Sequence, residues 1–231
     1  IMTANNEIGV LQPIQQIASL CKERDVTFHT DAAQGFGNIP LDFDQIGADF
    51  VSLSGHKIYG PKGIGLLIAS QECDLQPLQW GGNQEDGIRA GTVPVPLVVG
   101  LAKAVEIATT HLYVQSQRLK TLRDLLWQGL QEQIPDLVLN GSFEQRLPNN
   151  LNFTVMDIVG SRFHRKIKPF ISCSSGSACS NGEPSHVLAS LGRTTKQAEA
   201  SLRLSLGRQT TVEDVDVAID IISRVVSELR N

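Results

Sequence analysis

A lysine and an aspartate in this chain each follow a short run of residues typical of β-strands. Lys57 lies in the run SGHK at residues 54–57, after the strand-like residues 49–53, and Asp31 follows the strand-like residues 26–30. Two strand ends therefore present an amine and a carboxylate. Such a pair suits pyridoxal 5′-phosphate (PLP), because an amine can hold its aldehyde as a Schiff base while a carboxylate keeps its pyridine nitrogen protonated.

A cysteine in a run of small polar residues is a candidate nucleophile. Cys179 lies in the run SSGSACS at residues 174–180, where a core cysteine would pack poorly and an exposed thiol would be at home. The alternative is a passive loop thiol. The neighbours of Cys21 and Cys173 predict that both are buried. The four cysteines lack the close paired spacing of a zinc site and the density of a disulfide scaffold, so we expect reduced thiols and no metal site.

Several ordered motifs resemble those of the cysteine desulfurases of the NifS/IscS type, class V aminotransferases among the fold type I PLP enzymes. In chain order they are residues 5–9 (NNEIG), 29–34 (HTDAAQ), 54–57 (SGHK), 174–180 (SSGSACS) and 201–208 (SLRLSLGR). Together they span nearly the whole chain. Several motifs that agree in order are a specific signal, whereas any one of them alone would be weak.

The resemblance implies a role for each residue of the candidate site. It implies catalytic roles for Lys57, His56 and Cys179, and substrate contacts by Arg203 and Asn6. It implies cofactor contacts by Asn6, Asp31, Gln34, Ser54, His56, Lys57 and Thr92. Asp31 would contact the pyridinium nitrogen, Gln34 and Asn6 would lie near the phenolic oxygen, and Ser54 and His56 would bind phosphate. Thr92 would reach the phosphate of a partner subunit, which implies a homodimer with composite sites.

Each assignment has an ordinary alternative. Lys57 could be a surface lysine at a strand end, Asp31 could cap a helix, and Thr92 could be a loop threonine without a ligand. Arg203 lies among apolar neighbours on a predicted strand, where its guanidinium must pair with a carboxylate. That carboxylate could belong to the substrate or to the protein itself.

The motifs together predict a PLP-dependent cysteine desulfurase. It would convert L-cysteine to L-alanine and transfer the sulfur to an enzyme cysteine persulfide, for iron–sulfur cluster or thio-cofactor synthesis. The expected partners are L-cysteine, a second copy of the chain, and sulfur-acceptor or iron–sulfur scaffold proteins. Two alternatives stay open: a cofactor-free truncated fragment that acts as a dimerising or partner-binding scaffold, and a selenocysteine lyase of the same fold.

The first residue is Ile1, and the start of the chain looks cut. The resemblance implies a preceding segment that carries the loop cradling the cofactor phosphate and a histidine that stacks on the cofactor ring.

The composition limits the class of protein. The chain has 231 residues, 41% of them hydrophobic, which is enough for a substantial core. Its net charge of −4 and the absence of a basic run give no electrostatic case for nucleic-acid binding. No apolar run approaches the roughly 20 residues that span a bilayer, so we expect no membrane contact and a cytoplasmic protein.

The pattern of strands and helices predicts an α/β fold with two domains. Buried strands that alternate with helices predict a mostly parallel sheet, with the site at the carboxyl ends of its strands. We expect a partial PLP-binding large domain over residues 1–110 and a small α+β domain with the cysteine loop over residues 111–231. One continuous helix is predicted from residue 97 to about residue 133, and a capping-box signal in residues 210–213 (TTVE) predicts a final helix.

Overall fold

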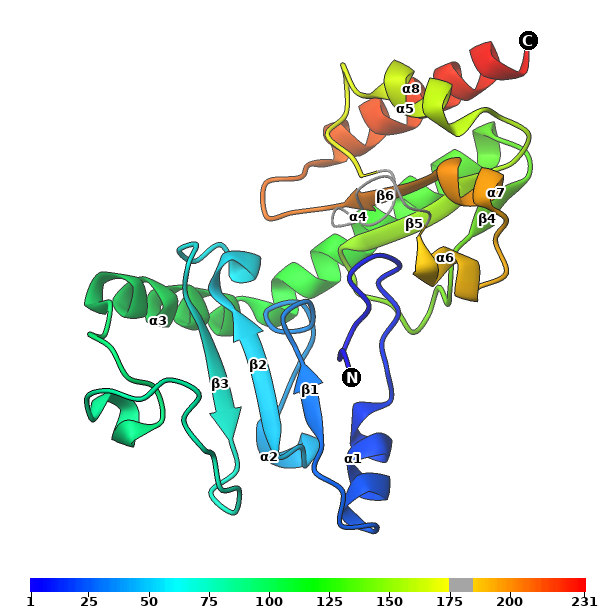
Figure 1. Ribbon diagram of the computed structural model, residues 1–231. Coiled ribbons are helices and arrows are strands. Elements are labelled where there is room, and N and C mark those ends of the chain that lie inside the picture. The colour runs from blue at the N-terminus through cyan, green and yellow to red at the C-terminus, as the bar shows by residue number, and fades with distance from the viewer. Residues whose placement is uncertain (175–184) are drawn as a thin grey trace. The chain divides into compact units, whose positions relative to one another are not determined.

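The computed structural model describes residues 1–174 and 185–231, and the chain divides into two compact units (Figure 1). The first unit comprises Ile1–Thr3 and Gln12–Leu112, and the second comprises Ala4–Leu11 and Tyr113–Asn231. Each unit contains a three-stranded sheet with its own hydrophobic core. The assignment of residues 1–110 and 111–231 to a large and a small domain stays a prediction.

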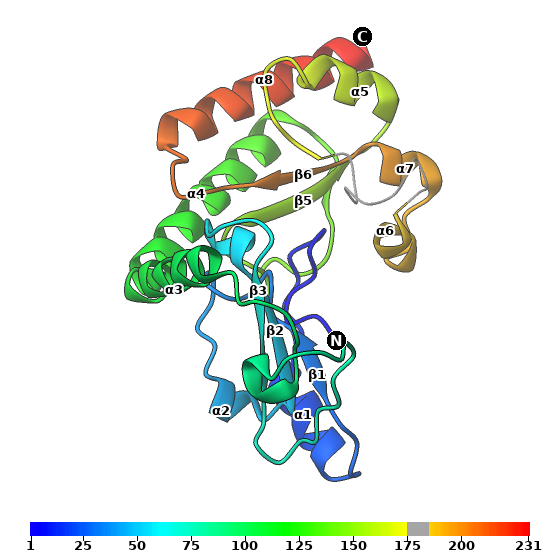
Figure 2. The same cartoon turned by 60° about the vertical axis from the view of Figure 1, so that its left-hand side comes forward.

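The sheet of the first unit is mixed rather than mostly parallel. Its strands are β1 (His29–Asp31), β2 (Phe50–Ser54) and β3 (Gly65–Ala69), in that order. β1 pairs in parallel with β2, whereas β3 is antiparallel to β2. Only residues 55–64 join β2 to β3, and a parallel return would need a crossover of a dozen or more residues. The chain therefore turns back antiparallel, as Figure 2 also shows.

Helices complete the first unit. They are α1 (Ile14–Lys22), α2 (Phe43–Ile46), α3 (Val95–Thr110) and the short 3₁₀ helices η1 (Gly55–Ile58) and η2 (Gln84–Gly87). α3 buries Leu101 and Ala104 in a core that also contains Val51 and Leu53 of β2 and Ile58 of η1. This packing fixes the end of β2 and the turn that follows it.

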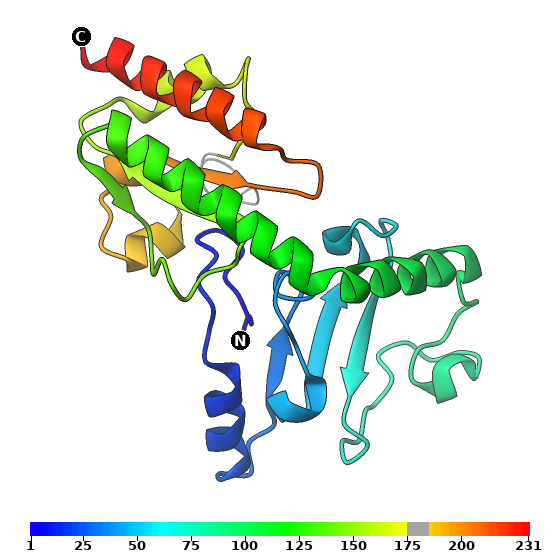
Figure 3. The same ribbon diagram turned by 180° about the vertical axis from the view of Figure 1, so that it is seen from behind.

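The second unit has an antiparallel sheet of β4 (Leu137–Leu139), β5 (Asn150–Val155) and β6 (Ser201–Ser205), in that order. Its helices are α4 (Leu112–Gln133), α5 (Gly160–Ile167), α6 (His186–Ser190), α7 (Thr195–Glu199) and α8 (Val212–Arg230). One face of the sheet is apolar, and its side chains form one core with those of α4 and α8, the two long helices in Figure 3. The predicted α+β character of this region is therefore observed.

Two predictions about long helices had different outcomes. The final helix begins with a capping box, but one residue later than predicted, because Thr211 Oγ1 accepts from the Asp214 amide and the Asp214 carboxylate accepts from the Thr211 amide. The single helix predicted from residue 97 is wrong, because α3 ends at Thr110 and α4 begins at Leu112, with His111 between them outside the helical region (φ −103°, ψ 5°).

None of the helices described is by itself long and apolar enough to cross a membrane, although α3 and α4 taken together pass that test by length and composition alone.

Candidate functional site

The carboxyl ends of β1 and β2 lie at the same edge of the sheet in the first unit. The two strands are parallel, and Asp31 stands opposite Ser52 in their register. β2 continues to Ser54, and η1 then carries His56 and Lys57. The structure thus brings the predicted carboxylate and amine to neighbouring strand ends, as the sequence led us to expect.

A tight turn places Lys57 directly after β2. The Gly55 amide donates to the Ile64 carbonyl at 3.0 Å, and a Cβ on Gly55 would meet that carbonyl oxygen at 3.0 Å. Tyr59 closes η1 in the left-handed region, at φ 64°. The sequence between Ser54 and Tyr59 therefore folds sharply, and a glycine at its start leaves room for the approach of β3.

Two side chains of η1, those of His56 and Lys57, face solvent. Ser54 Oγ lies 2.9 Å from His56 Nδ1, so this hydroxyl and imidazole already form a hydrogen-bonded pair. His56 and Lys57 are exposed, and Lys57 forms no ion pair within residues 1–174 and 185–231. An exposed amine is consistent with an ordinary surface lysine and also with a lysine that binds a cofactor. The exposure of Lys57 therefore does not distinguish between these two roles.

Asp31 closes a turn and caps no helix. Its Oδ1 accepts a hydrogen bond from the Ala33 amide at 2.9 Å, and residues 33–38 form turns. Among the residues that the structure describes, no donor bonds to the other carboxylate oxygen, Oδ2. Gln34 follows in the same turn and is half-buried, and its backbone carbonyl accepts from Asn38 Nδ2 at 3.0 Å. The local backbone therefore fixes one oxygen of Asp31 and leaves the second one for a ligand.

Thr92 lies in the exposed segment between η2 and α3. Its role toward a partner subunit stays a prediction.

Asn6 and Arg203, the residues predicted to bind the substrate, lie together in the second unit. Arg203 Nη1 donates to the Asn6 carbonyl at 2.8 Å. The turn that carries Asn6 is stabilised by Asn5, whose Oδ1 accepts from the amides of Glu7 and Ile8 at 2.9 Å each. Sequence reasoning identified both residues but not the contact between them.

The guanidinium of Arg203 has a donor without a partner among the described residues. Its Nε is buried and has no hydrogen-bond partner in the described part of the chain, and no carboxylate there forms an ion pair with Arg203. The alternative that Arg203 pairs with a carboxylate of this chain therefore finds no support among these residues. A carboxylate ligand would suit the planar Nε–Nη2 edge, because it can accept two parallel hydrogen bonds.

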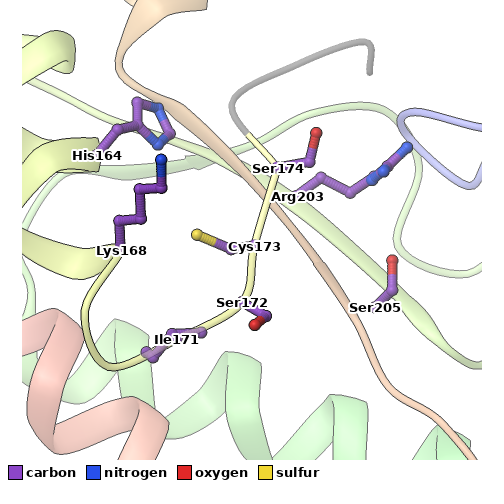
Figure 4. A pocket seen from close by; sticks show the side chains of 8 residues that line it. All are labelled: His164, Lys168, Ile171, Ser172, Cys173, Ser174, Arg203 and Ser205. Atoms are coloured by element: carbon purple, nitrogen blue, oxygen red, sulfur yellow. The ribbon is translucent and has the colours of Figure 1, made fainter. Parts of the chain in front are cut away.

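A pocket of about 640 Å³ adjoins Arg203 within the second unit (Figure 4). Its lining residues are His164, Lys168, Ile171, Ser172, Cys173, Ser174, Arg203 and Ser205. These described lining residues include cationic and hydroxyl side chains and no carboxylate. Sequence reasoning missed His164 and Lys168, because no motif marks them.

Burial shifts the pKa of two groups that line this pocket. It raises the pKa of the Cys173 thiol, so this thiol stays protonated at neutral pH and is a poor nucleophile. Burial also lowers the pKa of His164, although a hydrogen bond from its Nε2 to the Glu199 carbonyl (3.1 Å) opposes that shift. Cys173 was predicted to be buried in a strand, but it is half-buried, lies in no strand and packs against the edge of the core. Cys179, the predicted nucleophile, lies in residues 175–184, outside the described residues.

Comparison with known proteins places the chain in a family. The Aminotransferase class-V family matches residues 1–217. The chain belongs to this family. It is 42% identical to a protein named cysteine desulfurase IscS from Dictyoglomus turgidum over 234 residues, which cover all of this chain and 59% of that protein. The predicted NifS/IscS resemblance is therefore confirmed, and enzymes of this family use PLP.

Solved structures share the fold. A NifS-like protein from Rickettsia africae superposes with a TM-score of 0.90 at 32% identity, over 98% of this chain and 61% of the other. A protein named SspA, solved in complex with cysteine, superposes with a TM-score of 0.72 at 36% identity, over 89% of this chain and 57% of the other. The chain thus spans a little more than half the length of these relatives.

Proposed function

We propose that this chain carries the amine, carboxylate and sulfur-accepting thiol of a PLP-dependent cysteine desulfurase, which converts L-cysteine to L-alanine. The observation that carries the proposal is the parallel pairing of β1 with β2, which brings Asp31 and the run from Ser54 to Lys57 to one edge of a sheet. The family supports it, since relatives at about this level of identity are named cysteine desulfurases.

The residues at this edge fit PLP in charge and in hydrogen-bonding capacity. Lys57 would hold the aldehyde carbon through Nζ, and the Oδ2 atom of Asp31 would accept a hydrogen bond from the protonated pyridine nitrogen. The Ser54 hydroxyl and the His56 imidazole, paired through Nδ1 at 2.9 Å, would donate to phosphate oxygens, the imidazole through its Nε2. PLP, when bound, supplies an electron sink that weakens the bonds at the α-carbon of an amino acid.

The second unit supplies the groups that would hold the substrate. Arg203 would bind the carboxylate of L-cysteine through its Nε–Nη2 edge, because Nη1 already donates to the Asn6 carbonyl. A neutral Cys173 would not compete for the sulfur, since its burial favours the protonated thiol. The structure of SspA with cysteine supports this substrate class.

Cys179 would take the sulfur. Its thiolate would attack the sulfur of the substrate, forming a sulfur–sulfur bond while the carbon–sulfur bond breaks. The electron pair of the broken bond returns to carbon, which is protonated to give alanine. The net change is one thiol and one L-cysteine converted to one persulfide and one L-alanine, with no external oxidant. We extend the proposal to a homodimer in which Thr92 contacts the partner's cofactor phosphate, and to acceptor or scaffold proteins that collect the sulfur.

The test compares the PLP-loaded natural protein with its Cys179→Ser variant. We expect the unaltered protein to form equal amounts of alanine and bound persulfide from L-cysteine in a single turnover. The variant should form neither. Persulfide formation that persists in Cys179→Ser would refute the assignment of the nucleophile, and selenide release without sulfide release would indicate the selenocysteine lyase instead.

A further inference from the structure

Polar side chains on one face of the second sheet hold the turn that carries Asn6. Asn152 on β5 and Arg203 on β6 stand opposite each other in register. Arg203 Nη1 donates to the Asn6 carbonyl at 2.8 Å, and Asn152 Nδ2 donates to the Glu7 carbonyl at 3.1 Å. Two consecutive carbonyls of the turn are therefore bound by a cross-strand pair, which fixes the backbone on both sides of Glu7.

The amide of Asn152 is itself held in one orientation. Its side chain is fully buried, and its Oδ1 accepts from Asn140 Nδ2 at 2.8 Å. The Asn140 backbone amide also donates to the Asn152 carbonyl at 2.9 Å. Because Oδ1 is used as an acceptor, the NH₂ group must face the turn, where it meets the Glu7 carbonyl.

Further contacts tie the same turn to the unit. Asn150 Nδ2 also reaches the Glu7 carbonyl, at 3.3 Å. The Glu7 side chain is only 1% exposed, and its Oε2 accepts from Ser185 Oγ at 2.8 Å. The turn is thus held through two backbone carbonyls and one buried side chain, while Asn6 itself stays half-exposed.

We infer that Asn152 is a positioning residue: through the Glu7 carbonyl it sets the place of Asn6 relative to Arg203, and so shapes the site for the carboxylate of the amino-acid substrate. The role toward the substrate rests on the proposed function. The role toward the turn rests on the contacts of the second unit alone. Two measurements separate these two parts.

The first measurement is hydrogen exchange in the chain without added ligand. The amides of Glu7, Ile8 and Gly9 donate to Asn5 within the turn, at 2.9, 2.9 and 3.0 Å. Asn152→Asp keeps the size and the acceptor of the side chain and removes the donor to Glu7. We expect the exchange of these three amides to rise roughly fivefold, the effect of one lost hydrogen bond on local opening.

Thr154→Val is the matched control. Thr154 lies two residues along β5, is equally buried, and bonds to Asn140 and Ser201 but not to the turn. We expect it to lower stability while leaving the exchange of the turn within about twofold of the unaltered chain. Asn152→Ala serves as the second variant if Asn152→Asp does not fold, and it should loosen the turn in the same way. An equal rise in the control, or no rise in either Asn152 variant, would overturn the inference.

The second measurement is steady-state turnover of L-cysteine by the PLP-loaded natural protein. A displaced Asn6–Arg203 pair would weaken binding of the substrate carboxylate in the ground state and the transition state alike, so KM should rise about fivefold in Asn152→Asp with kcat nearly unchanged. A fall in kcat at constant KM would contradict the positioning role. If the unaltered protein does not turn over L-cysteine, the proposed function fails, whereas the exchange experiment still decides the role of Asn152 in the turn.

Discussion

Replacing Asp31 with asparagine separates the charge of this residue from its structural role. The Ala33 amide donates to Oδ1 at 2.9 Å, and the carbonyl oxygen of an asparagine side chain can accept the same bond. Asp31 is half-buried and forms no ion pair within residues 1–174 and 185–231. We therefore expect Asp31→Asn to change the free energy of unfolding by less than about 0.5 kcal/mol. Asp31→Ala loses the bond and should cost about 1 kcal/mol.

The effect of Asp31→Asn on catalysis should be much larger than its effect on stability. A charge-assisted hydrogen bond to the pyridinium contributes about 1.5–3 kcal/mol, which corresponds to a loss of roughly 10- to 150-fold in kcat/KM. Asparagine and alanine should lose activity to a similar extent, because both remove the charge. The assays are denaturant unfolding of each variant and turnover of L-cysteine by the PLP-loaded natural protein. A kcat/KM for Asp31→Asn within twofold of the unaltered protein would show that the charge of Asp31 does not contribute to catalysis.

Three further predictions follow from local contacts. Thr211→Ala removes the capping box at the start of α8 and should lower the free energy of unfolding, measured by denaturant titration, by about 1 kcal/mol. The control is Gln209→Ala, in the exposed turn before α8, which should change the free energy of unfolding very little. Gly55→Ala places a Cβ 3.0 Å from the Ile64 carbonyl oxygen and so disturbs the turn that carries Lys57. We expect this variant to bind PLP more weakly in a spectroscopic titration. Unchanged PLP binding would show that the turn tolerates a side chain at residue 55. Burial raises the pKa of Cys173, so only a small fraction of this thiol is ionised at neutral pH. Its alkylation rate should therefore keep rising with pH beyond the usual range of thiols. A plateau of the rate near pH 8.5, the ordinary thiol pKa, would contradict the raised pKa.

Features set by local sequence could be predicted. The leucines at helical spacing, Leu119, Leu122, Leu126 and Leu130, are all buried in the core of the second unit. The capping signal of residues 210–213 predicted the start of α8 to within one residue, since the capping box joins Thr211 and Asp214. The strand patterns also predicted strand ends near Asp31 and Ser54, and β1 and β2 are parallel neighbours. The helical spacing and the capping signal depend on residues a few positions apart, whereas the pairing of β1 with β2 joins distant residues such as His29 and Phe50.

Features set by distant contacts or by loop length could not be predicted. The direction of β3 depends on the short connection after β2 and not on the residues of β3 itself. The break at His111 carries neither glycine nor proline, so the helical pattern runs through it. β1 begins at His29 and not at Val26, which is 52% exposed.

The positioning role of Asn152 could be found only from the structure. A signal did exist in the sequence, because Asn150, Asn152 and Thr154 alternate with apolar residues in a strand. Such alternation normally indicates a face open to water, and here the residues on that face are buried under the turn that carries Asn6.

Chemical trapping of the cofactor on the protein shows directly whether Lys57 is the residue that binds PLP covalently. The natural protein is loaded with PLP, reduced with borohydride to fix any covalent link, and digested for mass spectrometry. We predict that the cofactor mass appears on the peptide containing Lys57 and disappears in Lys57→Ala, whereas it persists when Lys62, an exposed lysine in the following turn, is replaced by alanine. A link to any other lysine in the unaltered protein, or its absence from Lys57, would contradict the assignment of Lys57 as the Schiff-base residue.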